Sequence, residues 1–363
     1  EKYNTPHETA PFDKIKIEHY EPAIDEGIRQ QVSEVEDICN NPELPSFQNT
    51  IVALESSGKF LERVTTIFGN LLSAETNDDL QELAEKIMPA ISQRISPILS
   101  EHGNNINLNE KLFQRVKTVY EQKAKLNLTT EEQTLLQDTY DNFVRRGANL
   151  TGQQKEEYRR LTNELSKLTL QFSQNLLKET NNYELLLTQQ EQLGGLPESV
   201  IEAASQTAKE KGKEGWLFTL SAPSYVPFMT YNENRDLRQQ LYMAYNTRAT
   251  HNNEFNNFDV VRKLVNTRMS IAQLLGYDNY AEYTLKRRMA ENCNAVYDLL
   301  NQLFEAYLPT AQAEYNEIQE FARETEGAHF QLMPWDWNFY SEKLKNKKFN
   351  LTDEMLRPYF ELN

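Results

Sequence analysis

The spacing of apolar residues restricts this chain to a mostly helical fold. Apolar side chains recur at steps of three and four residues along most of the sequence, which places them on one face of a helix. One such series is formed by Tyr20, Ile24, Ile28, Val32, Val35 and Ile38. Only 12 of the 363 residues are Gly and 13 are Pro, so few positions interrupt helices. We therefore predict a mostly α, multi-helix fold, with two subdomains or one large helical array.

Hydroxyl and amide residues mark where several of these helices begin. Thr129 and Thr151 are each followed three residues later by Glu or Gln, the pattern of a capping box. Asn292 precedes a long periodic segment that contains Pro309 and extends to Phe321. We predict that Asn292 caps a long helix that kinks near Pro309.

The segment after Gly215 departs from the helical pattern. Residues 216–220 and 225–231 are rich in aromatic and β-branched residues and are separated by a Ser-Ala-Pro-Ser sequence. They predict a small β hairpin near 216–231, or two edge strands. An edge strand binds an extended peptide by strand addition, whereas a small sheet that only braces helices is the alternative. The candidate substrate-channel residues are Trp216, Phe218, Tyr225, Phe228 and Tyr231.

Charge and cysteine content exclude several classes of partner. The net charge is −16 and no block of Lys and Arg offsets it, so we predict no nucleic-acid partner. Cys39 and Cys293 lie in no metal or redox motif; we predict two buried thiols, with one long-range disulfide as the alternative. No apolar run reaches the roughly 18 residues of a membrane span. We expect a soluble protein, and the sequence leaves both a cytoplasmic and a periplasmic location open.

The chain carries no recognisable catalytic motif. None of its five histidines lies four residues from another, the spacing that places two zinc ligands on one face of a helix. His7-Glu8 begins such a motif, but Pro11 occupies the position of the second histidine. Nucleophile-elbow, phosphate-loop and dinucleotide-binding patterns are also absent from the sequence. We therefore predict no catalytic, cofactor-binding or metal-binding residue in this chain.

Three segments together resemble the M3 family of zinc oligopeptidases, and above all its dipeptidyl carboxypeptidases. The first runs from Trp216 through Arg235 and Arg238 to Arg248, and the second contains the sequence LLGYDNYAEY at 274–283. The third comprises Pro334-Trp335-Asp336-Trp337, Phe339-Tyr340 and Arg357-Pro358-Tyr359-Phe360. The opening Phe12-Asp13-Lys14-Ile15 is also similar to the start of these enzymes. The order and spacing of these segments along the whole chain make the resemblance specific.

The resemblance implies a helical lobe like those of neurolysin and thimet oligopeptidase. It also implies an enzyme that removes dipeptides from the free C-terminus of oligopeptides, with zinc held by a His-Glu-x-x-His helix and a later Glu. Those ligands would lie beyond Asn363, so zinc is expected in the full-length enzyme and not in this fragment. The implied domains are residues 1–210, an N-terminal helical region, and 211–363, the leading part of the catalytic-domain polypeptide.

The implied partners are oligopeptide substrates and the missing C-terminal catalytic lobe. By this reading the fragment forms one wall of the substrate channel and is inactive alone. Its aromatic terminal segment predicts an exposed apolar surface near the C-terminus, where the missing lobe would dock. The alternative is a catalytically silent helical scaffold or adaptor of peptidase-like fold. A His-Glu-x-x-His motif in the reading frame after Asn363 would favour the enzyme, and a stop codon there would favour the adaptor.

Overall fold

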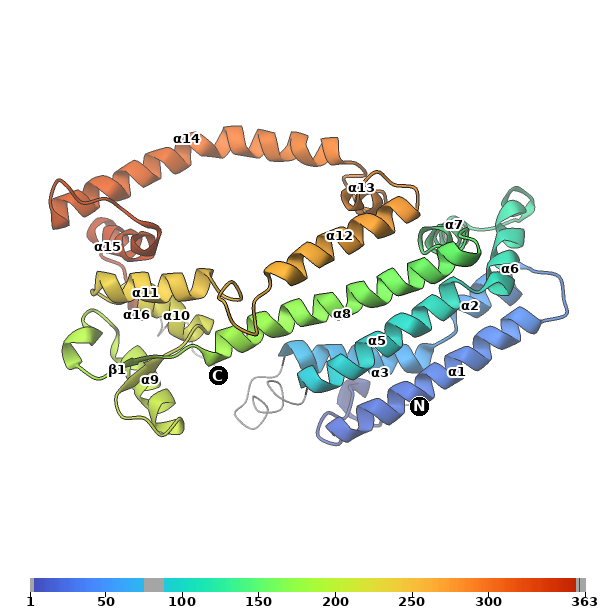
Figure 1. The fold of residues 1–363 in the computed structure, drawn as a ribbon, viewed down its shortest axis with the longest axis horizontal. Coiled ribbons are helices and arrows are strands. Elements are labelled where there is room, and N and C mark those ends of the chain that lie inside the picture. The colour runs from blue at the N-terminus through green and yellow to red at the C-terminus, as the bar shows by residue number, and fades with distance from the viewer. Residues whose placement is uncertain (1–2, 75–87, 357–358, 360–363) are drawn as a thin grey trace. The chain divides into compact units, whose positions relative to one another are not determined.

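The fold is mostly helical, as the apolar spacing predicts. The computed structural model describes residues 3–74, 88–356 and 359, and Figure 1 shows helices along most of this length. Contacts divide the chain into two compact units, Glu1–Gln171 with Lys263–Tyr283, and Phe172–Arg262 with Thr284–Asn363. The predicted domains, residues 1–210 and 211–363, are not tested by this division into compact units and stay a prediction.

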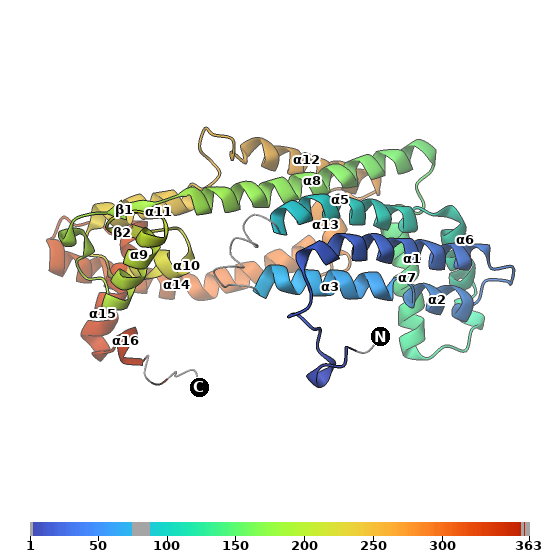
Figure 2. The same ribbon diagram turned by 90° about the horizontal axis from the view of Figure 1, so that it is seen from below.

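The first unit is a set of helices around apolar cores. Its elements include α1 (Tyr20–Asn40), α2 (Ala53–Glu55), α3 (Lys59–Ala74), α5 (Met88–Asn107), α6 (Glu110–Glu121) and α7 (Thr130–Arg145). Helices α1, α3 and α5 enclose one core, and Figure 2 shows them side by side. A second core joins α1, α6 and α7 through fully buried side chains that include Leu112, Val116 and Leu136. Helices α8 (Gly152–Asn182), α12 (Phe258–Leu274) and α13 (Tyr280–Leu285) each continue from one unit into the other.

The second unit combines helices with a small sheet. Its elements include β1 (Leu185–Leu187), α9 (Glu198–Glu210), β2 (Trp216–Phe218), α10 (Ala222–Tyr231), α11 (Arg235–Asn246), α14 (Cys293–Glu326), η7 (Pro334–Asp336), α15 (Trp337–Phe349) and α16 (Asp353–Leu356). The sheet and α9–α11 share one apolar core, which contains Phe218, Phe228 and Leu241. A second core lies between α14 and α15, where Ile318 and Ala322 meet Tyr340.

The predicted helix starts agree with the structure. Thr129 N–H donates to Glu132 Oε2 at 2.8 Å, and Glu132 N–H donates to Thr129 Oγ1 at 3.3 Å. Asn292 Oδ1 accepts from Ala295 N–H at 2.9 Å and begins α14. This helix contains Pro309 and ends at Glu326, beyond the predicted end. Local capping chemistry therefore placed these starts correctly. Helix α14 ends before Gly327, which has φ of +112° and donates its N–H to the Arg323 carbonyl at 2.9 Å.

The prediction of a hairpin within 216–231 was wrong about its second strand. Strand β2 pairs antiparallel with β1, with Leu185 opposite Phe218 and Leu187 opposite Trp216. The residues after β2 form α10 instead. Pro223 lies in the first turn of α10, where its missing N–H costs no helical hydrogen bond. The burial of Phe228 and Met229 on one face of α10 then outweighs the β propensity of its aromatic residues.

Cys39 and Cys293 form no disulfide, and both are half-buried. Along the ranges that the structure describes, no helix has both the length and the apolar character that crossing a bilayer requires.

Candidate functional site

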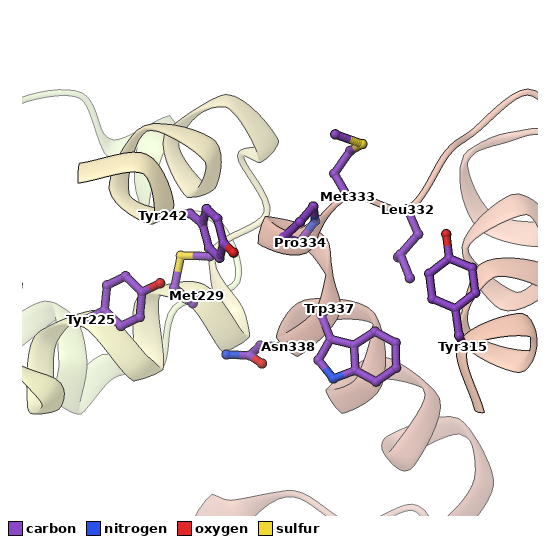
Figure 3. A pocket seen from close by; sticks show the side chains of 9 residues that line it. All are labelled: Tyr225, Met229, Tyr242, Tyr315, Leu332, Met333, Pro334, Trp337 and Asn338. Carbon is purple, nitrogen blue, oxygen red and sulfur yellow. The ribbon is translucent and has the colours of Figure 1, made fainter. Parts of the chain in front are cut away.

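An aromatic pocket lies within the second unit. It encloses about 550 Å³ and is lined from α10, α11, α14, η7 with the residues before it, and α15. The lining residues are Tyr225, Met229, Tyr242, Tyr315, Leu332, Met333, Pro334, Trp337 and Asn338. Figure 3 shows Tyr225, Met229 and Tyr242 on one side, Leu332, Tyr315 and Trp337 on the other, and the Asn338 amide between them. None of the nine side chains is charged.

The pocket has an apolar floor and an aromatic rim. Met229 and Leu332 are buried, whereas Trp337 and Tyr315 are exposed. The rings of Tyr315 and Trp337 stack with their centroids 6.4 Å apart and their planes 11° from parallel. Such walls accept a flat or branched apolar group and exclude water from around it.

Neutral polar groups supply the hydrogen-bonding capacity of the pocket. Burial, with smaller effects from Tyr242 and Tyr245, raises the pKa of Tyr225 to about 12. The Tyr225 hydroxyl is therefore protonated at neutral pH and is able to donate a hydrogen bond. Its ring stacks on Tyr245 at 4.2 Å between centroids, which fixes its direction. Together with the amide of Asn338, these groups suit an apolar side chain attached to a peptide backbone, because the backbone brings carbonyl acceptors and N–H donors.

A buried ion cluster fixes the α15 side of the pocket. Asp336, in the turn directly before Trp337, is fully buried. Arg238 Nη2 donates to its Oδ1 at 2.8 Å, and Arg235 Nη2 donates to its Oδ2 at 2.7 Å. The N–H of Met333 also donates to Oδ2, at 3.0 Å. The carboxylate therefore joins α11 to η7 and sets the position of Trp337.

Arg238 extends this cluster into the surrounding backbone. Its side chain is 1% exposed, and its Nη1 donates to the carbonyl of Asn232 at 2.8 Å. Its Nε donates to the carbonyl of Trp335 at 3.3 Å. The guanidinium carbon lies 4.0 Å from the centroid of the Phe339 ring, a cation–π contact. A buried Arg with this many partners acts as a structural anchor for the pocket wall.

The sequence-predicted site residues lie in different surroundings. Tyr225 lines the pocket, and Trp216 and Tyr231 are half-buried against the core below it. Phe218 and Phe228 are inside that core, where their rings meet edge-to-face at 4.7 Å. A role in substrate contact stays a prediction for all five, and the structure brings Tyr225 alone among them to this pocket.

Sequence reasoning missed the other pocket residues and the ion cluster. Tyr242, Arg235, Arg238 and Trp337 stood in the segments that carried the family resemblance, but nothing in their spacing predicted that they meet. One signal was available. Asp336 stands between two Trp residues, and a carboxylate in such an apolar run needs a buried cationic partner.

The histidines and acidic residues of the described ranges form no metal site. Within residues 3–74, 88–356 and 359, no cluster of three or more His, Cys, Asp or Glu side chains has the arrangement to hold an ion. His251 lies instead with its Nδ1 3.0 Å from Glu179 Oε2, and His102 Nε2 lies 2.7 Å from Gln31 Oε1. Both are structural contacts between neighbouring segments.

Several known peptidases are similar to this chain in sequence. Residues 228–363 match the sequence model of peptidase family M3. The chain is 36% identical to dipeptidyl carboxypeptidase of Escherichia coli (strain K12), over 99% of this chain and 51% of that protein. It is 32% identical to oligopeptidase A of Haemophilus influenzae, over 97% of this chain and 51% of that protein. It is 30% identical to an organellar oligopeptidase A of Arabidopsis thaliana, over 97% of this chain and 44% of that protein.

The fold is mostly helical, and the proteins that the chain matches are peptidases. The resemblance to peptidase family M3 seen in the sequence is confirmed, and the match to the family model lies in residues 228–363. Its mostly helical structure with one small antiparallel sheet is consistent with the helical lobe of such peptidases. The chain spans about half the length of the curated relatives it matches.

Proposed function

We propose that this chain is part of a zinc metallopeptidase that releases dipeptides from the C-terminus of oligopeptides. The observation that carries the proposal is the 36% identity to a dipeptidyl carboxypeptidase along 99% of the chain. In this proposal residues 1–210 form a helical region and 211–363 lead into the catalytic domain. The zinc ligands belong to a catalytic lobe outside the 363 residues, and that lobe is the partner of this chain.

The aromatic pocket gives this proposal a physical role for the chain. We assign it to the wall of the substrate channel, where its apolar floor takes up one side chain of an oligopeptide. The hydroxyl of Tyr225 and the amide of Asn338 then bond to the peptide backbone. Holding one side chain fixes the register of the peptide, which places the same bond at the reacting centre each time. The ion cluster of Arg235, Arg238 and Asp336 keeps Trp337 in position for this contact.

The experiment compares this chain with the product of its natural reading frame, read to the stop codon. Both are incubated with an oligopeptide that has a free C-terminus and with the same peptide amidated, and released dipeptides are measured by mass spectrometry. We expect the longer product to release dipeptides from the free peptide only, and to lose this activity with a chelator. The 363-residue chain should release none and hold less than equimolar zinc by metal analysis. A stop codon at Asn363, or a longer product without hydrolysis, would support the adaptor alternative instead.

The pocket is tested by Trp337→Ala in the longer product. Loss of the aromatic wall should raise KM about tenfold for peptides with apolar residues, equivalent to about 1.4 kcal/mol. Phe258→Ala is the matched control, because Phe258 is an exposed aromatic residue outside the pocket. Equal KM values for the two variants would remove the pocket from the proposal while leaving the peptidase assignment intact.

A further inference from the structure

Helix α14 exposes more apolar surface than is usual for a helix at the surface of a folded protein. Every residue from 297 through 317 is exposed. Eight large apolar side chains in this stretch are between 37% and 67% exposed: Tyr297, Leu299, Leu300, Leu303, Phe304, Tyr307, Leu308 and Tyr315. Single exposed apolar residues are ordinary, but a contiguous set of this size marks an interaction surface.

These side chains form a stripe that continues an existing interface. At about 100° per residue, Leu300, Phe304 and Tyr307 lie on the same face of α14 as Ile318 and Ala322. That face is buried against α15 at the C-terminal end of α14, where Figure 1 shows the two helices together. We call Leu300, Leu303, Phe304, Tyr307 and Leu308 the α14 stripe. It is the uncovered continuation of the face that α15 covers.

The opposite face of the helix is polar. Asp298, Gln302 and Glu305 lie there, and all three are exposed. Helix α14 is thus amphipathic over a length that far exceeds its contact with α15. An amphipathic helix of this kind reaches its stable state when a second apolar surface covers the stripe.

Charge distinguishes between the possible occupants of the stripe. Residues 293–316 contain Asp298, Glu305 and Glu314 and no Lys or Arg. Asp298 and Glu305 lie on the polar face, away from the stripe. A second copy would still bring together two chains that each carry a net charge of −16, and like charges oppose association. A favourable partner is apolar at its centre and carries Lys or Arg at its edges.

We propose that the α14 stripe docks the remaining part of the M3 polypeptide, through an apolar surface edged by basic side chains. The inference rests on the proposed function, in which this chain works together with a further lobe. It is supported by the relatives, of which the chain covers 51%, and by the continuity of the stripe with the α14–α15 interface. The exposed apolar residues Phe349, Met355 and Tyr359 agree with the surface predicted near the C-terminus, whereas Phe360 lies outside the described residues.

The test measures protection of the stripe by cysteine labelling. Cys39 and Cys293 are first replaced by Ser, and then either Leu300→Cys or Gln302→Cys is introduced. Leu300 belongs to the stripe, and Gln302 is the matched control on the polar face of the same turn. Maleimide labelling rates are compared between the 363-residue chain and the product of the natural reading frame.

Each outcome has a distinct meaning. We expect both positions to label rapidly in the 363-residue chain, and Leu300→Cys alone to slow at least tenfold in the longer product. Equal, rapid labelling in the longer product, or a reading frame that stops at Asn363, would overturn the docking proposal. Protection in the 363-residue chain that grows with concentration, together with a dimer mass by light scattering, would assign the stripe to a second copy. That result would also overturn the docking proposal. Protection without peptide hydrolysis would leave the docking intact and overturn only the proposed function.

Discussion

At the scale of single residues, Asp336 is held by charge and hydrogen bonds together. Its carboxylate has no exposed surface, and an unpaired ion in that position would be too costly to bury. Arg238, Arg235 and the N–H of Met333 all donate to its two oxygens. The cluster is therefore stable as a set, and removal of the carboxylate leaves the buried Arg238 without a compensating charge.

Asp336→Asn tests this dependence. The substitution keeps the size of the side chain but leaves the buried Arg238 without an anion, so we expect a loss of about 3–5 kcal/mol in the free energy of unfolding. Urea denaturation measures it. Asp259→Asn is the control, because Asp259 pairs with Arg262 at the surface, where both side chains are mostly exposed. It should cost less than about 1 kcal/mol, and similar losses for the two variants would contradict a special role for the buried cluster.

Glu179 provides a pH-dependent prediction. It accepts a hydrogen bond from Ala249 N–H at 2.7 Å and contacts His251 and Asn253. Burial acts to raise the pKa of Glu179, but the hydrogen bonds from Asn253, Ala249 and His251 outweigh it and lower the pKa below 4.5. A lowered folded-state pKa gives stability that is fully present above the unfolded-state value and is lost as the pH falls through the folded-state value.

Glu179→Gln should therefore destabilise the protein in a pH-dependent manner. The difference in unfolding free energy from the unsubstituted chain should be largest near pH 7 and should shrink below about pH 4. Urea unfolding of both proteins across this range measures the difference. A constant difference at all pH values would show that the carboxylate charge contributes nothing to the contact with the loop around His251.

At the scale of elements, the small sheet depends on a close approach of two backbones. Gly215 precedes β2 and has φ of +113°, and a Cβ atom there would lie 2.3 Å from the carbonyl oxygen of Leu187 in β1. Gly212 has φ of +66° but has no atom within 4 Å of its would-be Cβ. The two glycines thus differ in steric surroundings and share a backbone conformation that favours glycine.

Replacing each glycine by Ala separates these two effects. Gly212→Ala should cost about 1–2 kcal/mol from the left-handed conformation alone. Gly215→Ala should cost about 1–3 kcal/mol more, since the Leu187 carbonyl has to move and the pairing of β1 with β2 weakens. Thermal unfolding compares them, and equal shifts in Tm would show that the backbone contact is unimportant.

Local sequence signals predicted the helices but not the partner of β2. Capping residues such as Thr129 and Asn292 act within one turn, so their effect is legible in the sequence. Strand β1 has only three residues, Leu185–Leu187, which are too few for a periodic signal. The segment that connects β1 to Trp216–Phe218 contains all of α9. No local sequence rule predicts a pairing across a connection of that length.

At the scale of the whole molecule, the family was predictable and the pocket was not. The resemblance rested on short segments in the right order, which the sequence alone displays. The pocket combines Tyr225, Tyr315 and Trp337 from helices far apart in the chain, so it exists only after tertiary packing. The α14 stripe could be predicted in part. Periodicity predicts its helix, but only the structure shows which part of one face α15 covers.

The link between Arg238 and Asp336 also determines when the pocket is completed. The two residues are 98 positions apart, and closing a loop of that length costs roughly 4 kcal/mol of chain entropy before any contact is gained. During synthesis, α11 leaves the ribosome long before Asp336 does. Until then its two arginines lack their anionic partner, and the pocket has no second wall. The peptide contact that we propose for the pocket therefore becomes possible only after Trp337 has been synthesised.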